Sequence, residues 1–159
     1  MQKIICSLML LLLSCFSAMS QAPAMSVYAE LGGPGIASLN FDSRFSAKED
    51  GLGGRLGIGY FKVDQSSVLF VPVGVNYLLG KDQKNYLEVG GGITFVSEKD
   101  NSYSSVSTGA FSTTFGHLWF GYRLQPKNDG ITFRAGLNPV FGNGFFIPYY
   151  FGISVGYKF

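Results

Sequence analysis

Alternation of apolar with small or polar residues, at a period of two, is the feature that most constrains what this chain can fold into. Strands produce this period because successive side chains point to opposite faces, whereas a helix requires a period of 3.6. The pattern is clearest over 149–159. It recurs, between clusters of turn residues, over 26–33, 35–46, 52–62, 68–79, 85–96, 113–124 and 130–141. The sequence therefore predicts an all-β chain of eight strands.

The two faces of these strands differ in a way that indicates a membrane. One face is bulky and apolar, and the other holds mostly Gly, Ser, Asn and Arg. Only 14% of the 159 residues are charged, which is too few for a solvated exterior such as that of a soluble lipocalin barrel. Strands of about 11 residues can cross a bilayer at a tilt, and an even number closes without free edges. We therefore expect a closed antiparallel eight-stranded transmembrane β-barrel with its apolar face toward lipid.

Aromatic residues near both ends of the apolar face support this orientation, because such girdles mark the two membrane interfaces. One predicted girdle consists of Phe45, Tyr77, Tyr122, Tyr157 and Phe159. Part of the other consists of Tyr60, Phe95, Tyr149 and Phe151.

The first 20 residues carry the parts of a secretory signal peptide. Lys3 precedes an apolar run over 4–13, which is too short to span a bilayer, and the small residues Ala18 and Ser20 precede the predicted cleavage point. We expect a signal peptide over 1–20 and a single barrel domain over 21–159. An alternative, in which Cys15 is lipidated, is disfavoured by the poor fit of the preceding residues to a lipoprotein cleavage box. Both cysteines lie in this segment, so the exported chain has no disulfide.

The segment 21–159 resembles the small eight-stranded outer-membrane β-barrels of Gram-negative bacteria, the OmpA, OmpX and OmpW kind. The most specific part of the resemblance is the run Phe151, Ile153, Val155, Tyr157 and Phe159. This run is similar to the signal by which the barrel-assembly machinery recognises its clients. The resemblance implies an outer-membrane protein in contact with lipid and with that machinery, and we expect a monomer. Its short connections, near 47–51, 80–84 and 125–129, would face the periplasm, and Gly33-Pro34-Gly35, 63–67, 97–112 and 142–148 would face outward.

Charged residues on the inward face are the first candidate site. Isolated buried charges are costly, so we expect them to pair across the lumen near the periplasmic ends of their strands. Eight strands enclose just enough room for side chains, which favours a plug over an ion-selective constriction. The residues are Glu30, Asp42, Arg44, Arg55, Glu88, Arg123, Arg134 and Lys158.

A second candidate site is aromatic and lies in the outer half of the lumen. It consists of Phe61, Phe70, His117 and Trp119, with Val140 beside them. A packed core is the favoured interpretation, and a cavity for a hydrophobic ligand, similar to OmpW-type barrels, is the alternative.

Enzymatic chemistry has little support. His117 is the only histidine, and a catalytic triad would need Ser112 with Asp64 or Glu98. The resemblance to outer-membrane lipid A deacylases fails because Trp119, not Ser, stands two residues after His117. No metal or cofactor site and no nucleic-acid partner is expected, given one His and a net charge of +2. The leading hypothesis is a non-catalytic envelope or surface protein with a plugged lumen. A narrow channel or hydrophobic-ligand conduit comes second, and an outer-leaflet lipid enzyme third.

Overall fold

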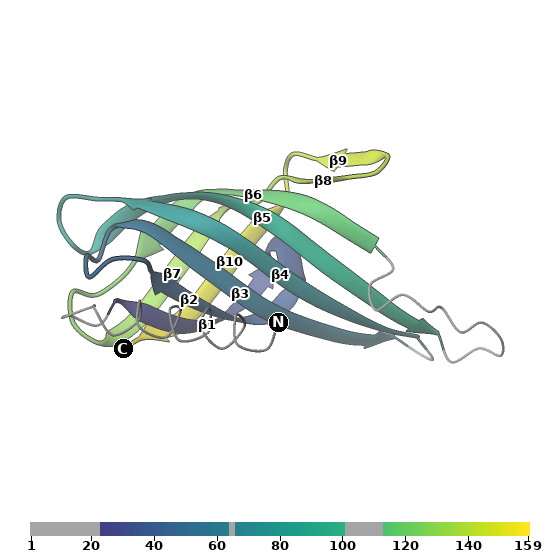
Figure 1. The fold of residues 1–159 in the computed structure, drawn as a ribbon, viewed down its shortest axis with the longest axis horizontal. Helices are drawn as coiled ribbons and strands as arrows, with labels where there is room; N and C mark the ends of the chain where they lie inside the picture. Colours follow the sequence, from purple (N-terminus) through teal and green to yellow (C-terminus); the bar gives the residue numbers. More distant parts are fainter. Residues whose placement is uncertain (1–22, 64–65, 101–112) are drawn as a thin grey trace, which may run out of the picture.

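The computed structural model describes residues 23–63, 66–100 and 113–159, which form a single antiparallel sheet rolled into a barrel (Figure 1). The predicted signal peptide over 1–20, including Cys15, lies outside the described residues. The strands are β1 (Met25–Gly32), β2 (Ala37–Arg44), β3 (Gly51–Val63), β4 (Ser66–Leu79), β5 (Asn85–Asp100), β6 (Thr113–Leu124), β7 (Gly130–Leu137), β8 (Val140–Gly142), β9 (Phe145–Ile147) and β10 (Phe151–Lys158). A short 3-10 helix, η1 (Gly33–Gly35), joins β1 to β2.

Eight of these strands form the wall, which confirms the predicted closed antiparallel barrel. Their order around the wall is β5-β4-β3-β2-β1-β10-β7-β6, and β5 pairs with β6 to complete the ring. β1 and β10 close the wall at the other junction, where Val27 lies opposite Tyr157. Strands β8 and β9 form a separate hairpin that attaches to β6.

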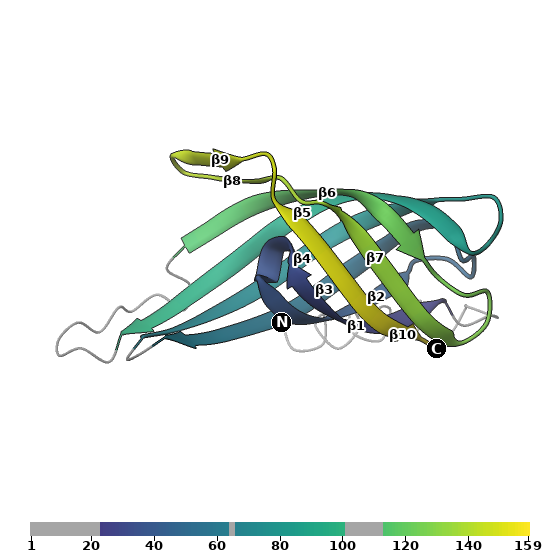
Figure 2. The same ribbon diagram turned by 180° about the vertical axis from the view of Figure 1, so that it is seen from behind.

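The two ends of the barrel differ (Figures 1 and 2). The short connections over 45–50, 80–84 and 125–129 lie at one end, which we call the turn end. At the opposite end, the loop end, β3 to β6 rise higher than their neighbours because they have 12–16 residues, whereas β1, β2, β7 and β10 have eight each. The loop-end rim is therefore oblique.

Two predicted strand boundaries are wrong at the loop end, and one connection there is buried where an exposed loop was expected. The strand expected over 130–141 stops at Leu137, because Pro139 has no N–H to continue the ladder, and the chain then leaves the wall as the β8–β9 hairpin. β5 continues to Asp100 instead of ending near residue 96. The connection at 33–35 lies at the end opposite the short turns, as expected, but it is not an exposed loop: Gly33, Pro34 and Gly35 are all buried, inside the barrel mouth.

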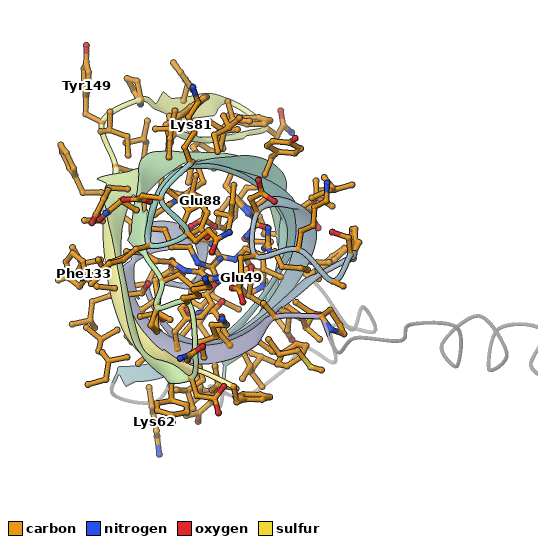
Figure 3. All side chains as sticks on the ribbon, turned by 90° about the vertical axis from the view of Figure 1, so that its left-hand side faces the viewer. Glu49, Lys62, Lys81, Glu88, Phe133 and Tyr149 are labelled. Atoms are coloured by element: carbon orange, nitrogen blue, oxygen red, sulfur yellow. The ribbon has the colours of Figure 1, made fainter. Side chains whose placement is uncertain are left out.

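The faces of the strands are those that the alternation predicts. Leu39, Ile58 and Ile153 on the outer face are 60%, 55% and 53% exposed, whereas Arg44 and Arg123 on the inner face are 1% and 2% exposed. Figure 3, viewed from the turn end, shows side chains radiating from the outside of the ring and nitrogen and oxygen atoms gathered within it. The predicted girdle residues Phe45, Tyr77, Tyr122, Tyr157, Phe159, Tyr60, Tyr149 and Phe151 are all exposed, and Phe95 is half-buried. Among the helices of the described residues, none is long and apolar enough to cross a membrane.

Glycines make the narrow interior wide enough for its large side chains. A Cβ at Gly156 would lie 2.3 Å from the Cβ of Tyr28 on the neighbouring strand, and a Cβ at Gly53 would lie 2.2 Å from the guanidinium carbon of Arg44. Large inward side chains therefore stand opposite positions without a side chain, which is how an eight-stranded barrel accommodates them.

Candidate functional site

The structure places the eight predicted charged residues inside the barrel, each at most 6% exposed. They come from seven of the eight strands of the wall. All except β4 supply at least one, and β10 supplies Lys158. Seven of them form a central group, which we call the charged belt: Glu30, Asp42, Arg44, Arg55, Glu88, Arg123 and Arg134.

Asp42 is the centre of the charged belt. Arg44 donates to both of its carboxylate oxygens at 2.9 and 3.0 Å, and Arg123 donates to Oδ1 through two nitrogens at 3.0 and 3.1 Å. Asn76 donates to Oδ2 at 2.6 Å, and Nη2 of Arg134 lies 3.5 Å from Oδ1. A single carboxylate thus joins groups from β2, β4, β6 and β7 across the lumen, and it is 0% exposed.

Glu88 is a second acceptor beside this centre. The amide of Asn76 donates to its Oε1 at 2.8 Å, so one amide bridges two carboxylates. Nη1 of Arg134 lies 3.5 Å from the same oxygen, and Nη1 of Arg123 lies 3.8 Å from it. Each of these two guanidinium groups is therefore shared between both carboxylates.

Glu30 and Arg55 form a neighbouring ion pair at 2.7 Å, and Arg55 also donates to Asn40 at 3.0 Å. Tyr28 links this pair to the centre, because its ring lies 3.9 Å from the guanidinium carbon of Arg134 and 5.7 Å from that of Arg55. The position of Glu30 corrects the expectation that all these charges lie near the turn end. Its carboxyl reaches toward η1, where a Cβ at Gly33 would lie 2.7 Å from it.

Lys158 does not join the charged belt. Its ammonium donates at 2.5 Å to Glu49 and at 3.1 and 2.9 Å to the carbonyl oxygens of Pro126 and Lys127. Gln125 donates to the other carboxylate oxygen of Glu49 at 2.8 Å. The connection over 45–50 is thus fastened across the turn end, where Figure 3 shows Glu49 within the outline of the ring.

No family model matches this sequence. No curated protein matches it either. Among solved structures, it is similar to the N-terminal β-barrel domain of Pseudomonas aeruginosa OprF, with 14% identity and a TM-score of 0.59 over 87% of this chain and 98% of that one. It is also similar to the outer membrane protein Ail of Yersinia pestis in a phospholipid bilayer nanodisc, with 13% identity and a TM-score of 0.54 over 86% of this chain and 99% of that one.

The chain has the fold of a small outer-membrane β-barrel. This finding confirms the fold expected from the resemblance noted above, and at 13–14% identity it concerns the fold alone. The exposed apolar residues on the outside of the wall, such as Leu39, Ile58 and Ile153, form a surface that we call the apolar belt. Such a surface is stable in lipid and not in water, which explains why this barrel carries it.

The predicted aromatic group falls into two parts in this barrel. Phe61 and Phe70 pack edge to face, with ring centroids 6.1 Å apart, and both are half-buried. His117 and Trp119 are buried deeper in the wall, at 1% and 3% exposure. In the strand ladder, Phe70 lies opposite Val96, and Val96 lies opposite Thr113, which precedes His117 on β6 by four residues. The two parts are therefore offset along the barrel.

The surroundings of His117 bear on the catalytic hypothesis. Nδ1 of His117 lies 3.3 Å from Oγ1 of Thr94 on the neighbouring strand. Ser112 and Asp64 lie outside the described residues, and so does the side chain of Glu98. Over 23–63, 66–100 and 113–159, no group of three or more His, Cys, Asp or Glu side chains is placed to hold a metal ion.

Sequence reasoning did not single out the uncharged members of this site. Tyr28, Asn40 and Asn76 all lie on the inward face of their predicted strands, so the parity of the alternation was a usable signal for them. Glu49 and Gln125 lie in connections, where no alternation exists to indicate which way a side chain points.

Proposed function

We propose that this protein is a non-catalytic outer-membrane barrel whose lumen is closed by its own side chains and whose outer loops carry its role in the cell envelope. One observation carries the proposal: Asp42 accepts hydrogen bonds from three side chains on three different strands, at the centre of the lumen. A pore needs an open path there, and this position is filled by a buried ion-pair network.

The energetics of the charged belt favour a closed lumen. Hydrogen bonds between ionised groups are about twice as strong as neutral ones. Removing one partner of a buried pair leaves an uncompensated charge, at a cost of about 3–5 kcal/mol. Arg123 and Arg134 each contact both Asp42 and Glu88. An ion that crossed the charged belt would have to break these contacts.

The burial of His117 supports the non-catalytic part of the proposal. A general base must reach the proton that it removes. This imidazole is 1% exposed and faces Thr94 rather than the outer surface.

The outer surface of the barrel supports an outer-membrane location and assembly by the barrel-assembly machinery. Phe151, Ile153, Val155, Tyr157 and Phe159 all face outward on or beside β10, each more than half exposed. An apolar edge of this kind is available to the barrel-assembly machinery and, after assembly, to lipid. We propose that the barrel is a monomer exported by the signal peptide over 1–20, with its turn end in the periplasm.

Conductance in a planar bilayer tests the closed lumen. The refolded wild-type barrel is expected to show no steady openings. The double variant Asp42→Ser/Arg123→Ser removes one buried charge of each sign and is expected to open a path. A matched control, Lys81→Ser/Asp82→Ser, makes the same change of charge in an exposed turn and is expected to stay silent.

Steady openings from a demonstrably folded wild-type barrel, altered when Arg55 or Glu88 is neutralised, would refute the closed lumen. The protein would then be a pore with a charged constriction.

A further inference from the structure

The β8–β9 hairpin is an outer connection to which the proposed function assigns no specific contact. It attaches to the wall through the pairs Gly116–Phe141 and His117–Val140 on β6, and the N–H of Leu118 donates to the carbonyl of Pro139 at 2.9 Å. Among the described strands, β9 pairs with β8 only. Figures 1 and 2 both show the hairpin outside the ring, beside the loop-end half of β6.

The surface of this hairpin is unusual for a loop that projects from a barrel. The segment 135–157, which includes the whole hairpin, contains no charged residue. Phe146 is 65% exposed and Tyr149 is 79% exposed, while Phe141, Phe145 and Ile147 are each 40–48% exposed. A contiguous apolar surface of this kind indicates an interface, because leaving it in water costs about 25 cal/mol for each Å².

The apolar surface of the hairpin is continuous with the apolar belt on the outside of the wall. Phe141 covers Gly116, where a Cβ would lie 2.3 Å from its ring, and Gly116 pairs in turn with Ile93, which is 48% exposed in the belt. Phe145 packs edge-on against Phe115, with centroids 6.3 Å apart. The hairpin therefore extends the outer wall of the barrel sideways, and Phe141 joins its apolar surface to that of the wall.

The unpaired edge of β9 limits how deeply the hairpin can lie in a membrane. The outer edge of β9 has no strand partner among the described residues, and unpaired backbone groups cost several kcal/mol each in the hydrocarbon core. Aromatic side chains favour the membrane–water interface, where backbone groups still reach water. We propose that the β8–β9 hairpin is a lipid-contact flap that lies in the interfacial layer of the outer leaflet, where its aromatic and apolar side chains bind the upper acyl-chain region of the lipids.

Site-specific fluorescence tests this placement. The sequence after residue 20 contains no cysteine, so Phe146→Cys gives a single attachment point for an environment-sensitive dye. The labelled barrel is refolded into phosphatidylcholine vesicles that contain lipids with a nitroxide near the glycerol end, and aqueous iodide is added separately. Leu39→Cys in the belt and Lys81→Cys in an exposed turn are the lipid and water controls.

The proposal predicts that the Phe146 dye is quenched by the shallow nitroxide several-fold more than the Lys81 dye, and by iodide several-fold less. Quenching by iodide as strong as at Lys81, without nitroxide quenching, would overturn it. The hairpin would then face water and be free to bind a protein. If the Leu39 dye also escapes the nitroxide, the barrel is not in the bilayer, and the proposed location fails together with the flap.

A second variant keeps the test independent of a single dye position. Phe145→Ser/Phe146→Ser/Ile147→Ser is expected to leave the barrel folded, as judged by its heat-dependent migration on a gel, because β9 is not part of the wall. A dye at Asn143→Cys, in the hairpin turn, is expected to become several-fold more accessible to iodide in this background. Equal accessibility in both backgrounds would contradict the flap.

Discussion

Removing the charge of Asp42 is expected to destabilise the barrel more than any other loss of a single carboxylate. Asp42→Asn keeps the shape of the side chain but leaves three guanidinium groups, those of Arg44, Arg123 and Arg134, with a neutral neighbour. The charged belt has four arginines and three carboxylates, so its formal charge rises from +1 to +2. Hydrogen bonds to charged groups contribute about 1.5–3 kcal/mol each, but groups in one network are not additive. Breaking a buried pair costs about 3–5 kcal/mol, and this is the loss we expect.

Urea unfolding of the vesicle-bound barrel measures this loss. Trp119 is the only tryptophan of the sequence and is 3% exposed, so its fluorescence reports the barrel interior without interference. Asp129→Asn is the matched control, since this aspartate is exposed in the last turn, and its effect is expected to stay within about 0.5 kcal/mol.

Two results would contradict this role of Asp42. A loss below about 1 kcal/mol for Asp42→Asn would mean that the network contributes no more than an exposed pair. The second point is compensation: Asp42→Asn/Arg123→Met restores the belt to +1, with three arginines and two carboxylates, and is expected to be more stable than Asp42→Asn alone. An equally unstable double variant would show that charge is not the cause.

Two further predictions concern the interior glycines and the turn end. Gly156→Ala places a methyl group 2.3 Å from the Cβ of Tyr28 and is expected to cost about 1–3 kcal/mol in the same urea assay, whereas Ser154→Ala, on the same inward face, is expected to change little; equal midpoints would count against the steric argument. Asp82 accepts hydrogen bonds from the side chain and the backbone amide of Asn85, which hold the pKa of its carboxyl below the ordinary value. Its contribution to stability is therefore present above the unfolded pKa and lost as the pH falls through the folded pKa. An NMR titration in which Asn85→Ala leaves the pKa of Asp82 unchanged would contradict this cause.

The alternation in the sequence predicted the faces of the wall because a period of two is a property of every strand. Asp42 and Glu88 are inward by parity alone, and so are the asparagines that join them. Which arginine meets which carboxylate could not be predicted in this way. Asp42 and Arg123 are 81 residues apart, and their contact depends on how the strands are staggered around the ring, which the pattern of one strand does not contain.

The elements that sequence reasoning missed are those without alternation. Phe145, Phe146 and Ile147 are consecutive apolar residues between glycines and a proline. The sequence alone predicts an outward loop over 142–148 there, and no strand. The buried turn η1 has composition typical of an exposed connection, Gly-Pro-Gly, and it enters the barrel mouth because Gly32 and Gly33 adopt positive φ angles of 70° and 68°. Both depend on tertiary contacts with β6 or with the mouth, not on local propensity.

The junction between β1 and β10 has a consequence for how this protein is made. These are the first and last strands of the barrel, and they meet along seven residue pairs, from Ser26–Lys158 to Gly32–Gly152. Every folding intermediate in which residues 151–158 have not yet joined the sheet is an open ribbon with two unpaired edges, and it cannot close into a ring. Contacts between residues so distant in sequence form slowly, and the open strand edges promote aggregation until β1 and β10 have paired. The refolding yield is therefore expected to depend more on how fast residues 151–158 reach β1 than on the stability of the finished barrel.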